Sequence, residues 1–207
     1  MSEQNFSDWL REQCAGDWDA VVGHPFATAI IDGTADMRHY LEQDFQFVDS
    51  FTALLGAAVA AADSFAARVP YGQFLGQVAT TEEKTYFHRA LEALGGSTTA
   101  ATAPVTGEFR ALMDEVRVSQ DYPRIVAVLC VAEWCYLGWA SRATAPLTAS
   151  PIHREWIELH EGPEFCAWVA FLRGELDRLD EQRRDGVLET FRRAVALERR
   201  FFDMAAG

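Results

Sequence analysis

Apolar side chains recur at intervals of three and four residues along almost the whole chain, and this spacing restricts the possible fold more than any other feature. It places apolar residues on one face of an α-helix, whereas a half-buried β-strand needs them at every second residue. The sequence contains no run of four to eight alternating β-branched residues bounded by turns. It therefore predicts an all-α protein.

Proline and glycine divide this pattern into helices, because both residues favour helix ends. The expected helices cover residues 4–20, 25–31, 35–62, 72–95, 105–119, 122–143, 151–160, 163–181 and 186–206. Pro70 and Gly72 set the start of the fourth helix, and residues 96–104 resemble a loose linker. A chain of 207 residues with 49% hydrophobic side chains is long enough to bury one core and short for two. We expect a single domain over residues 1–207.

The chain carries a strong negative charge, which argues against polyanionic partners. Its 31 acidic residues outnumber its 18 basic residues, so the net charge is −13. Proteins that bind nucleic acids or anionic membranes usually present a basic cluster, and here the basic clusters do not exceed pairs such as Arg183 and Arg184. We expect neither a nucleic acid nor a membrane as partner.

Sequence features also indicate a cytoplasmic location. The longest apolar run, residues 53–62, is shorter than the roughly 18 residues that span a bilayer. Residues 1–16 lack the basic and apolar regions of a secretory signal. The cysteines show no CxxC pair or zinc-ligand spacing, which is typical of free thiols in a reducing compartment; they are Cys14, Cys130, Cys135 and Cys166.

Three acidic residues interrupt stripes that are otherwise apolar. Asp44, Glu133 and Glu198 each lie in such a stripe, on three different expected helices. Burying a carboxylate is costly unless a partner binds it, and burial raises its pKa. Taken singly, each acid is more typical of a core carboxylate bound to an Arg or Tyr. Together they indicate either one shared polar cavity or three separately compensated sites.

The histidine spacing does not fit a metal site. A di-iron bundle requires Glu-x-x-His pairs on facing helices. Here Glu82 and Glu83 precede His88 by six and five residues, and Glu155 precedes His160 by five. The sequence also lacks a Gly-rich phosphate loop, a GxSxG elbow and an HExxH motif. We therefore predict no metal and no cofactor.

Four segments carry a family resemblance. They are HPFATAIIDGTADMRHYLEQDFQFVDSF at residues 24–51, AEWCYLGWA at 132–140, WIELHEGPEF at 156–165 and FRRAVALERRFFDMA at 191–205. Together they resemble the TenA family of thiamin-salvage hydrolases, also called thiaminase II, over nearly the whole chain. The resemblance implies a heme-oxygenase-like all-α bundle whose central pocket holds a small aminopyrimidine. It also implies a homo-oligomer, either a tetramer or a dimer.

The resemblance also implies roles for individual residues. Asp44 would hold the amino and ring-nitrogen edge of the pyrimidine, and Glu198 would exchange a proton with the leaving group. The remaining pocket positions would be occupied by Phe47, Phe109, Tyr136, His160 and Phe201. Three of these stand where many relatives have tyrosine: Phe47, Phe109 and His160.

One position departs from the larger branch of the family. Ala132 falls where many members carry a nucleophilic cysteine, and Glu133 is adjacent to it. The sequence around Glu133 resembles a second branch of the family, which uses glutamate and hydrolyses 4-amino-5-aminomethyl-2-methylpyrimidine or its N-formyl derivative. In such a two-carboxylate reaction, Glu133 would activate water and Glu198 would protonate the leaving nitrogen. Cys135, one turn further along, is the competing nucleophile.

Other functions on the same fold remain open at this point. A cysteine-dependent thiaminase II would use Cys135. A regulator or binding protein would hold a pyrimidine without turnover, although the net charge argues against direct DNA binding. An oxidative enzyme on this fold would need a cofactor that the ligand spacing does not support.

Overall fold

The computed structural model describes residues 4–206, except for the side chains of residues 81–84. The described residues form helices and connecting loops without a strand, so the all-α prediction is confirmed. The α-helices are α1 (Phe6–Gln13), α2 (Ala15–Val22), α3 (Pro25–Asp32), α4 (Met37–Ala61), α5 (Phe65–Gln77), α6 (His88–Leu94), α7 (Pro104–Ser119), α8 (Tyr122–Ala140), α9 (Pro151–Leu159), α10 (Gly162–Asp177) and α11 (Val187–Ala206). A π-helical segment, η1 (Val78–Phe87), joins α5 to α6, and a short 3-10 turn, η2 (Glu181–Arg183), precedes α11.

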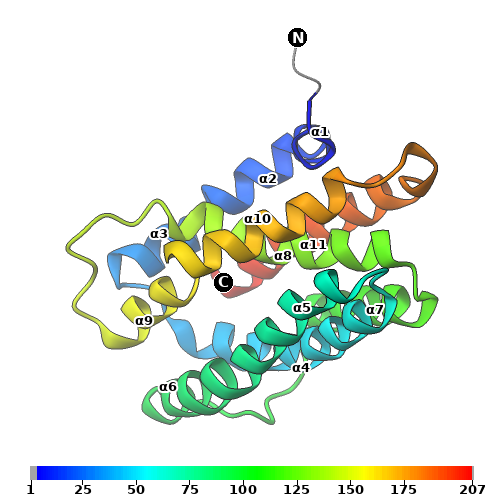
Figure 1. The fold of residues 1–207 in the computed structure, drawn as a ribbon. Coiled ribbons are helices and arrows are strands. Elements are labelled where there is room, and N and C mark those ends of the chain that lie inside the picture. Colours follow the sequence, from blue (N-terminus) through cyan, green and yellow to red (C-terminus); the bar gives the residue numbers. More distant parts are fainter. Residues whose placement is uncertain (1–3, 207) are drawn as a thin grey trace.

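Helix α8 runs through the centre of the bundle (Figure 1). It packs against α11, α10, α4, α2 and α7, and every side chain from Ile125 to Tyr136 is buried. By length and composition alone α8 is apolar enough to cross a membrane, but 83% of its 18-residue apolar window is buried inside the bundle. A search for uninterrupted apolar runs does not single it out, because Glu133 interrupts the run. Its apolar character is accounted for by its place in the core.

The expected helix over residues 4–20 is wrong, because the chain changes direction within it. Helix α1 ends at Cys14, whose φ of −118° and ψ of 14° lie outside the helical region, and α2 follows. Gly16 lies two residues after Cys14, in the first turn of α2, and glycine weakens a helix by about 1 kcal/mol relative to alanine. Both helices bury apolar side chains, such as Leu10 and Trp18. The apolar spacing alone therefore does not reveal the break.

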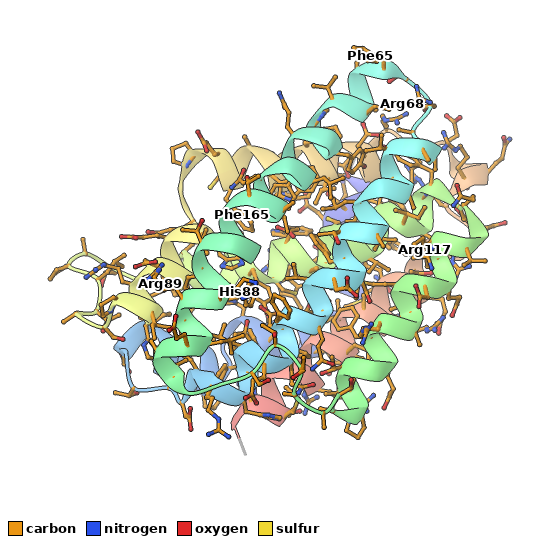
Figure 2. The ribbon with its side chains drawn as sticks, turned by 90° about the horizontal axis from the view of Figure 1, so that it is seen from below. Phe65, Arg68, His88, Arg89, Arg117 and Phe165 are labelled. Carbon is orange, nitrogen blue, oxygen red and sulfur yellow. The ribbon has the colours of Figure 1, made fainter. Side chains whose placement is uncertain are left out.

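The expected helix start after Pro70 is also wrong. Pro70 lies inside α5, which begins at Phe65 and continues through η1 into α6 as one rod; Figure 2 shows Phe65 near one end and His88 towards the other. Ser64 caps the rod, since its Oγ accepts a hydrogen bond of 3.1 Å from the N–H of Ala67. The missing N–H of Pro70 removes one backbone bond early in the helix. A capped helix packed on α4 tolerates that loss.

Gln43 anchors the linker predicted at residues 96–104, which is a loop ending where α7 begins. Its Oε1 accepts hydrogen bonds from the N–H of Ala103 (2.8 Å) and the hydroxyl of Thr106 (2.9 Å), and its Nε2 donates to the carbonyl of Ala101 (2.9 Å). Consecutive helical residues point about 100° apart. By holding Gln43 towards the loop, these bonds fix the rotation of α4 and turn the next residue, Asp44, towards the bundle interior.

Candidate active site

The three predicted acids all point into the bundle, as their stripes indicate. Asp44 on α4, Glu133 on α8 and Glu198 on α11 are 4%, 8% and 1% exposed. Helix α8 packs against both α4 and α11, so these side chains come from neighbouring helices. The opposite face of α11 is exposed and carries arginines paired with acids on other helices, namely Arg193 with Glu115, Arg199 with Asp17 and Arg200 with Glu108.

A small cavity lies where α4, α8 and α9 meet. Its volume is about 30 Å³, enough for one or two water molecules. Its wall is formed by Asp44, Phe47, Val48, Phe51, Ala132, Glu133, Tyr136, Trp156 and His160. Five residues predicted from the sequence therefore share one cavity: Asp44, Phe47, Glu133, Tyr136 and His160.

Three other predicted residues lie behind this wall. The ring of Phe109 meets that of Phe47 edge-on at 4.9 Å between centroids, and the ring of Phe201 lies 6.3 Å from Phe47 and 5.8 Å from Tyr40. Glu198 is buried and lies within electrostatic range of Asp44. Phe109, Phe201 and Glu198 thus form a second layer around the cavity, whereas the sequence placed them directly on its surface.

Glu198 lies in a strongly desolvated position. Burial, and secondly the negative charge of Asp44, raise the pKa of Glu198 well above its usual value. Its Oε1 atom is buried and has no hydrogen-bond partner among the described residues. A neutral carboxyl group is far less costly in such a place than a charged one. Glu198 is therefore suited to holding a proton.

His160 lies at the C-terminal end of α9 with its ring against the cavity. Its Nδ1 donates a hydrogen bond of 2.8 Å to the backbone carbonyl of Trp156, and its ring packs 4.8 Å from that of Tyr136. Burial lowers the pKa of His160 to about 4. The imidazole is therefore neutral near pH 7, and its Nε2 is an acceptor because Nδ1 carries the hydrogen.

Cys135 is not among the residues that line the cavity. Its neighbours in sequence, Ala132, Glu133 and Tyr136, face the cavity instead. Cys135 is fully buried, and burial followed by the charge of Glu198 raises the pKa of its thiol well above the usual value. A thiol in this state is a poor nucleophile, because the thiolate is the reactive form.

The match of residues 11–207 to the model of the TENA/THI-4/PQQC family covers nearly the whole chain. The chain belongs to this family. The resemblance found in the four sequence segments is thereby confirmed.

Several known proteins are similar to this chain over almost their full length. A protein named aminopyrimidine aminohydrolase from Halalkalibacterium halodurans is 23% identical over 215 residues, covering 97% of this chain and 95% of that protein. A TenA homologue from Pyrococcus furiosus is 17% identical with a TM-score of 0.86, covering 97% and 99% of the two chains. A TenA family transcription regulator from Silicibacter sp. TM1040 is 22% identical with a TM-score of 0.84, covering 99% of each chain. The solved structures establish the shared fold.

Sequence reasoning missed two residues of the site in this member of the TENA/THI-4/PQQC family. Trp156 lines the cavity, and its ring lies 4.4 Å from that of His160. Tyr40 lies behind the cavity and meets the hydroxyl of Tyr136. Each missed residue precedes a predicted one by four positions, Tyr40 before Asp44 and Trp156 before His160. The one-turn spacing was a usable signal, because residues four apart share a helix face.

Within the described part of the chain, no group of three or more His, Cys, Asp and Glu side chains is arranged to hold a metal ion. The side chains of Glu82 and Glu83, near His88 in sequence, lie outside that part.

Proposed function

We propose that this chain hydrolyses a C–N bond of an aminopyrimidine in thiamin salvage, with 4-amino-5-aminomethyl-2-methylpyrimidine or its N-formyl derivative as substrate. The observation that carries the proposal is that Asp44 and Glu133 meet at one aromatic-walled cavity, with a proton-holding Glu198 buried behind it. Family membership and the similarity to a protein named aminopyrimidine aminohydrolase support it.

The roles follow from the different surroundings of the acids. Asp44 faces the cavity from α4 and accepts hydrogen bonds from the amino and ring-nitrogen edge of the pyrimidine. Glu133 faces it from α8, where it takes a proton from water. Glu198 has the raised pKa that a general acid needs near neutral pH. Glu133 would then do the base work and Glu198 the acid work.

The reaction balances with water as the only co-reactant. For the aminomethyl substrate, the water oxygen bonds to the methylene carbon while the C–N bond breaks. Glu133 receives the proton of water and Glu198 supplies a proton to the departing amine, so the products are ammonia and the hydroxymethylpyrimidine. For the N-formyl derivative, water adds to the formyl carbon, and the products are formate and the free amine.

The cavity must widen to admit a pyrimidine ring, because about 30 Å³ holds only one or two water molecules. Phe47 is the wall residue best placed to move. Its side chain is only partly buried, whereas Phe51 and Trp156 are buried. Phe47 stacks on Phe51 with centroids 5.6 Å apart, an arrangement that a planar ring would extend.

The deciding experiment measures ammonia release from 4-amino-5-aminomethyl-2-methylpyrimidine by the wild type and by Glu133→Gln, Glu198→Gln and Cys135→Ser. Glu108→Gln is the matched control, because Glu108 is an exposed glutamate outside the cavity. We expect Glu133→Gln and Glu198→Gln each to lose at least a hundredfold in kcat/KM. We expect Cys135→Ser and Glu108→Gln to retain turnover.

The competing functions give different outcomes in the same assay. Loss of turnover in Cys135→Ser alone would assign the protein to cysteine-dependent thiamin cleavage. Saturable pyrimidine binding without ammonia or formate release by the wild type would contradict the hydrolase proposal and favour a binding protein.

A further inference from the structure

Tyr40 and Tyr136 form a buried pair that connects α4 to α8. Their hydroxyl oxygen atoms lie 2.6 Å apart, a short hydrogen bond between two phenols. Tyr136 lines the cavity, whereas Tyr40 is fully buried one layer behind it. The pair therefore links the inner surface of the site to residues that substrate does not reach.

The ring of Tyr136 is held by other rings, and these hold its plane without directing its hydroxyl hydrogen. It packs 4.8 Å from His160, 5.8 Å from Trp139 and 5.8 Å from Phe202. The Nδ1–H of His160 already bonds the carbonyl of Trp156. The hydroxyl of Tyr40 is thus a rigid polar contact for an oxygen that is otherwise set among aromatic faces.

The bond between Tyr40 and Tyr136 uses only one of their two hydroxyl hydrogens. Two phenols carry two hydroxyl hydrogens, and one of them occupies the bond between the oxygens. Both phenols lie within range of the charge of Asp44, and burial together with this charge raises the pKa of each phenol well above its usual value. Both hydroxyls therefore stay protonated throughout the working pH range. When Tyr40 donates to Tyr136, the hydrogen of Tyr136 remains available to the cavity.

We propose that Tyr40 is a positioning residue for this site: its hydroxyl donates to Tyr136 and so aims the O–H of Tyr136 at a nitrogen or oxygen atom of the bound pyrimidine. This inference rests on the proposed function for the identity of the ligand. Tyr40 itself does not touch the ligand, so its effect passes entirely through Tyr136.

The chain offers a matched control pair. Tyr71 and Tyr122 also join two helices through their hydroxyls, 3.0 Å apart, and Tyr122 in turn donates to Glu175. None of these three residues lines the cavity. Tyr71→Phe therefore removes a buried phenol bond of the same kind without reaching the site.

The test combines kinetics with a double-mutant cycle on Tyr40→Phe, Tyr136→Phe, the double variant and Tyr71→Phe. We expect Tyr40→Phe to weaken binding of the pyrimidine and so to lower kcat/KM by about tenfold, and to lower Tm by about as much as Tyr71→Phe does. Because Tyr40 acts through Tyr136, the double variant should be no slower than Tyr136→Phe alone. The proposal is overturned if the two losses multiply, or if Tyr71→Phe is equally slow.

A second readout separates this inference from the proposed function. The dissociation constant of 4-amino-5-aminomethyl-2-methylpyrimidine is measured by titration for the same four variants and the wild type. If the wild type binds the pyrimidine without turnover, the hydrolase proposal fails, and the same non-additivity in the dissociation constants still supports the role of Tyr40. Additive changes in affinity, or no binding by the wild type, would contradict it.

Discussion

The carboxyl group of Glu198 lies within electrostatic range of Asp44 and keeps one oxygen, Oε1, buried without a hydrogen-bond partner among the described residues. Burial is the larger cause and the charge of Asp44 the smaller cause of the raised pKa of Glu198. Two acids that share one desolvated region do not both ionise easily. Asp44 faces the cavity, so Glu198 is the one that keeps its proton.

Replacing Glu198 should change how stability depends on pH. The folded-state pKa of Glu198 is raised, so its contribution is fully present below pH 4.5 and is lost as pH rises towards that folded value. Glu198→Gln resembles the protonated side chain and lacks this loss. Between pH 4.5 and the folded-state pKa of Glu198, we expect the unfolding free energy of the variant to gain about 1.4 kcal/mol per pH unit relative to that of the wild type. Urea unfolding at pH 4.5, 6 and 8 measures this, and a constant difference would contradict it.

The fold was largely predictable because burial and helix formation share one period. The inward stripes of α4, α8 and α11 lie where the spacing places them, and Asp44, Glu133 and Glu198 are buried. The ends of the helices were harder to predict, because they depend on backbone conformation and on capping. Cys14 ends a helix without a proline, whereas Pro70 lies inside one that Ser64 caps.

The site was predictable only as far as one helix face reveals it. Spacing and family resemblance predicted Phe47, Tyr136 and His160 as pocket residues, and these three line the cavity. They did not reveal which residues lie behind the wall, since depth depends on how helices distant in sequence pack. Phe109 and Phe201 lie in the second layer for that reason.

His160 should make the fold sensitive to acid. Its pKa is lowered by burial to about 4, against 6.5 for an unperturbed histidine, so the unfolded state binds a proton more readily between these values. The stabilising contribution is present above pH 6.5 and is lost as pH falls through 4. His160→Gln lacks this contribution. Between pH 6.5 and pH 4 the unfolding free energy of the wild type should therefore fall by about 3 kcal/mol more than that of the variant.

Parallel slopes for the two proteins would contradict a buried neutral His160. The comparison is a difference between variants because other groups titrate at low pH. Hydrogen bonds from Arg193 and Arg124 lower the pKa of Glu115 to about 2, for example, and that contribution is the same in both proteins. Denaturant unfolding at pH 7, 5.5 and 4 provides the measurement.

The cysteines should differ sharply in reactivity. Cys166 is exposed, whereas Cys14, Cys130 and Cys135 are buried. Burial raises the pKa of the Cys135 thiol, so it is neither accessible nor ionised. We expect a disulfide reagent to modify Cys166 alone in the native protein and the remaining thiols only after unfolding.

Turnover should survive modification of Cys166. In Cys166→Ser, the native protein should no longer react with the disulfide reagent. Inactivation that accompanies labelling of Cys135, with protection by the pyrimidine, would support the cysteine-dependent mechanism instead.

Phe47 should control entry to the cavity. Its ring stacks on Phe51 and meets Phe109 edge-on. The cavity has a volume of only about 30 Å³, and Phe47 is partly buried whereas the other residues that line the cavity are buried. In Phe47→Ala the movement of this ring no longer limits entry of the pyrimidine, so the association rate of the pyrimidine should rise. Dissociation should rise more, because the stacking surface is lost, and the dissociation constant should increase by about tenfold. Stopped-flow binding of the pyrimidine measures both rates, with Phe65→Ala as a control at a side chain that is 80% exposed. An unchanged association rate in Phe47→Ala would show that the pyrimidine enters past a different part of the wall.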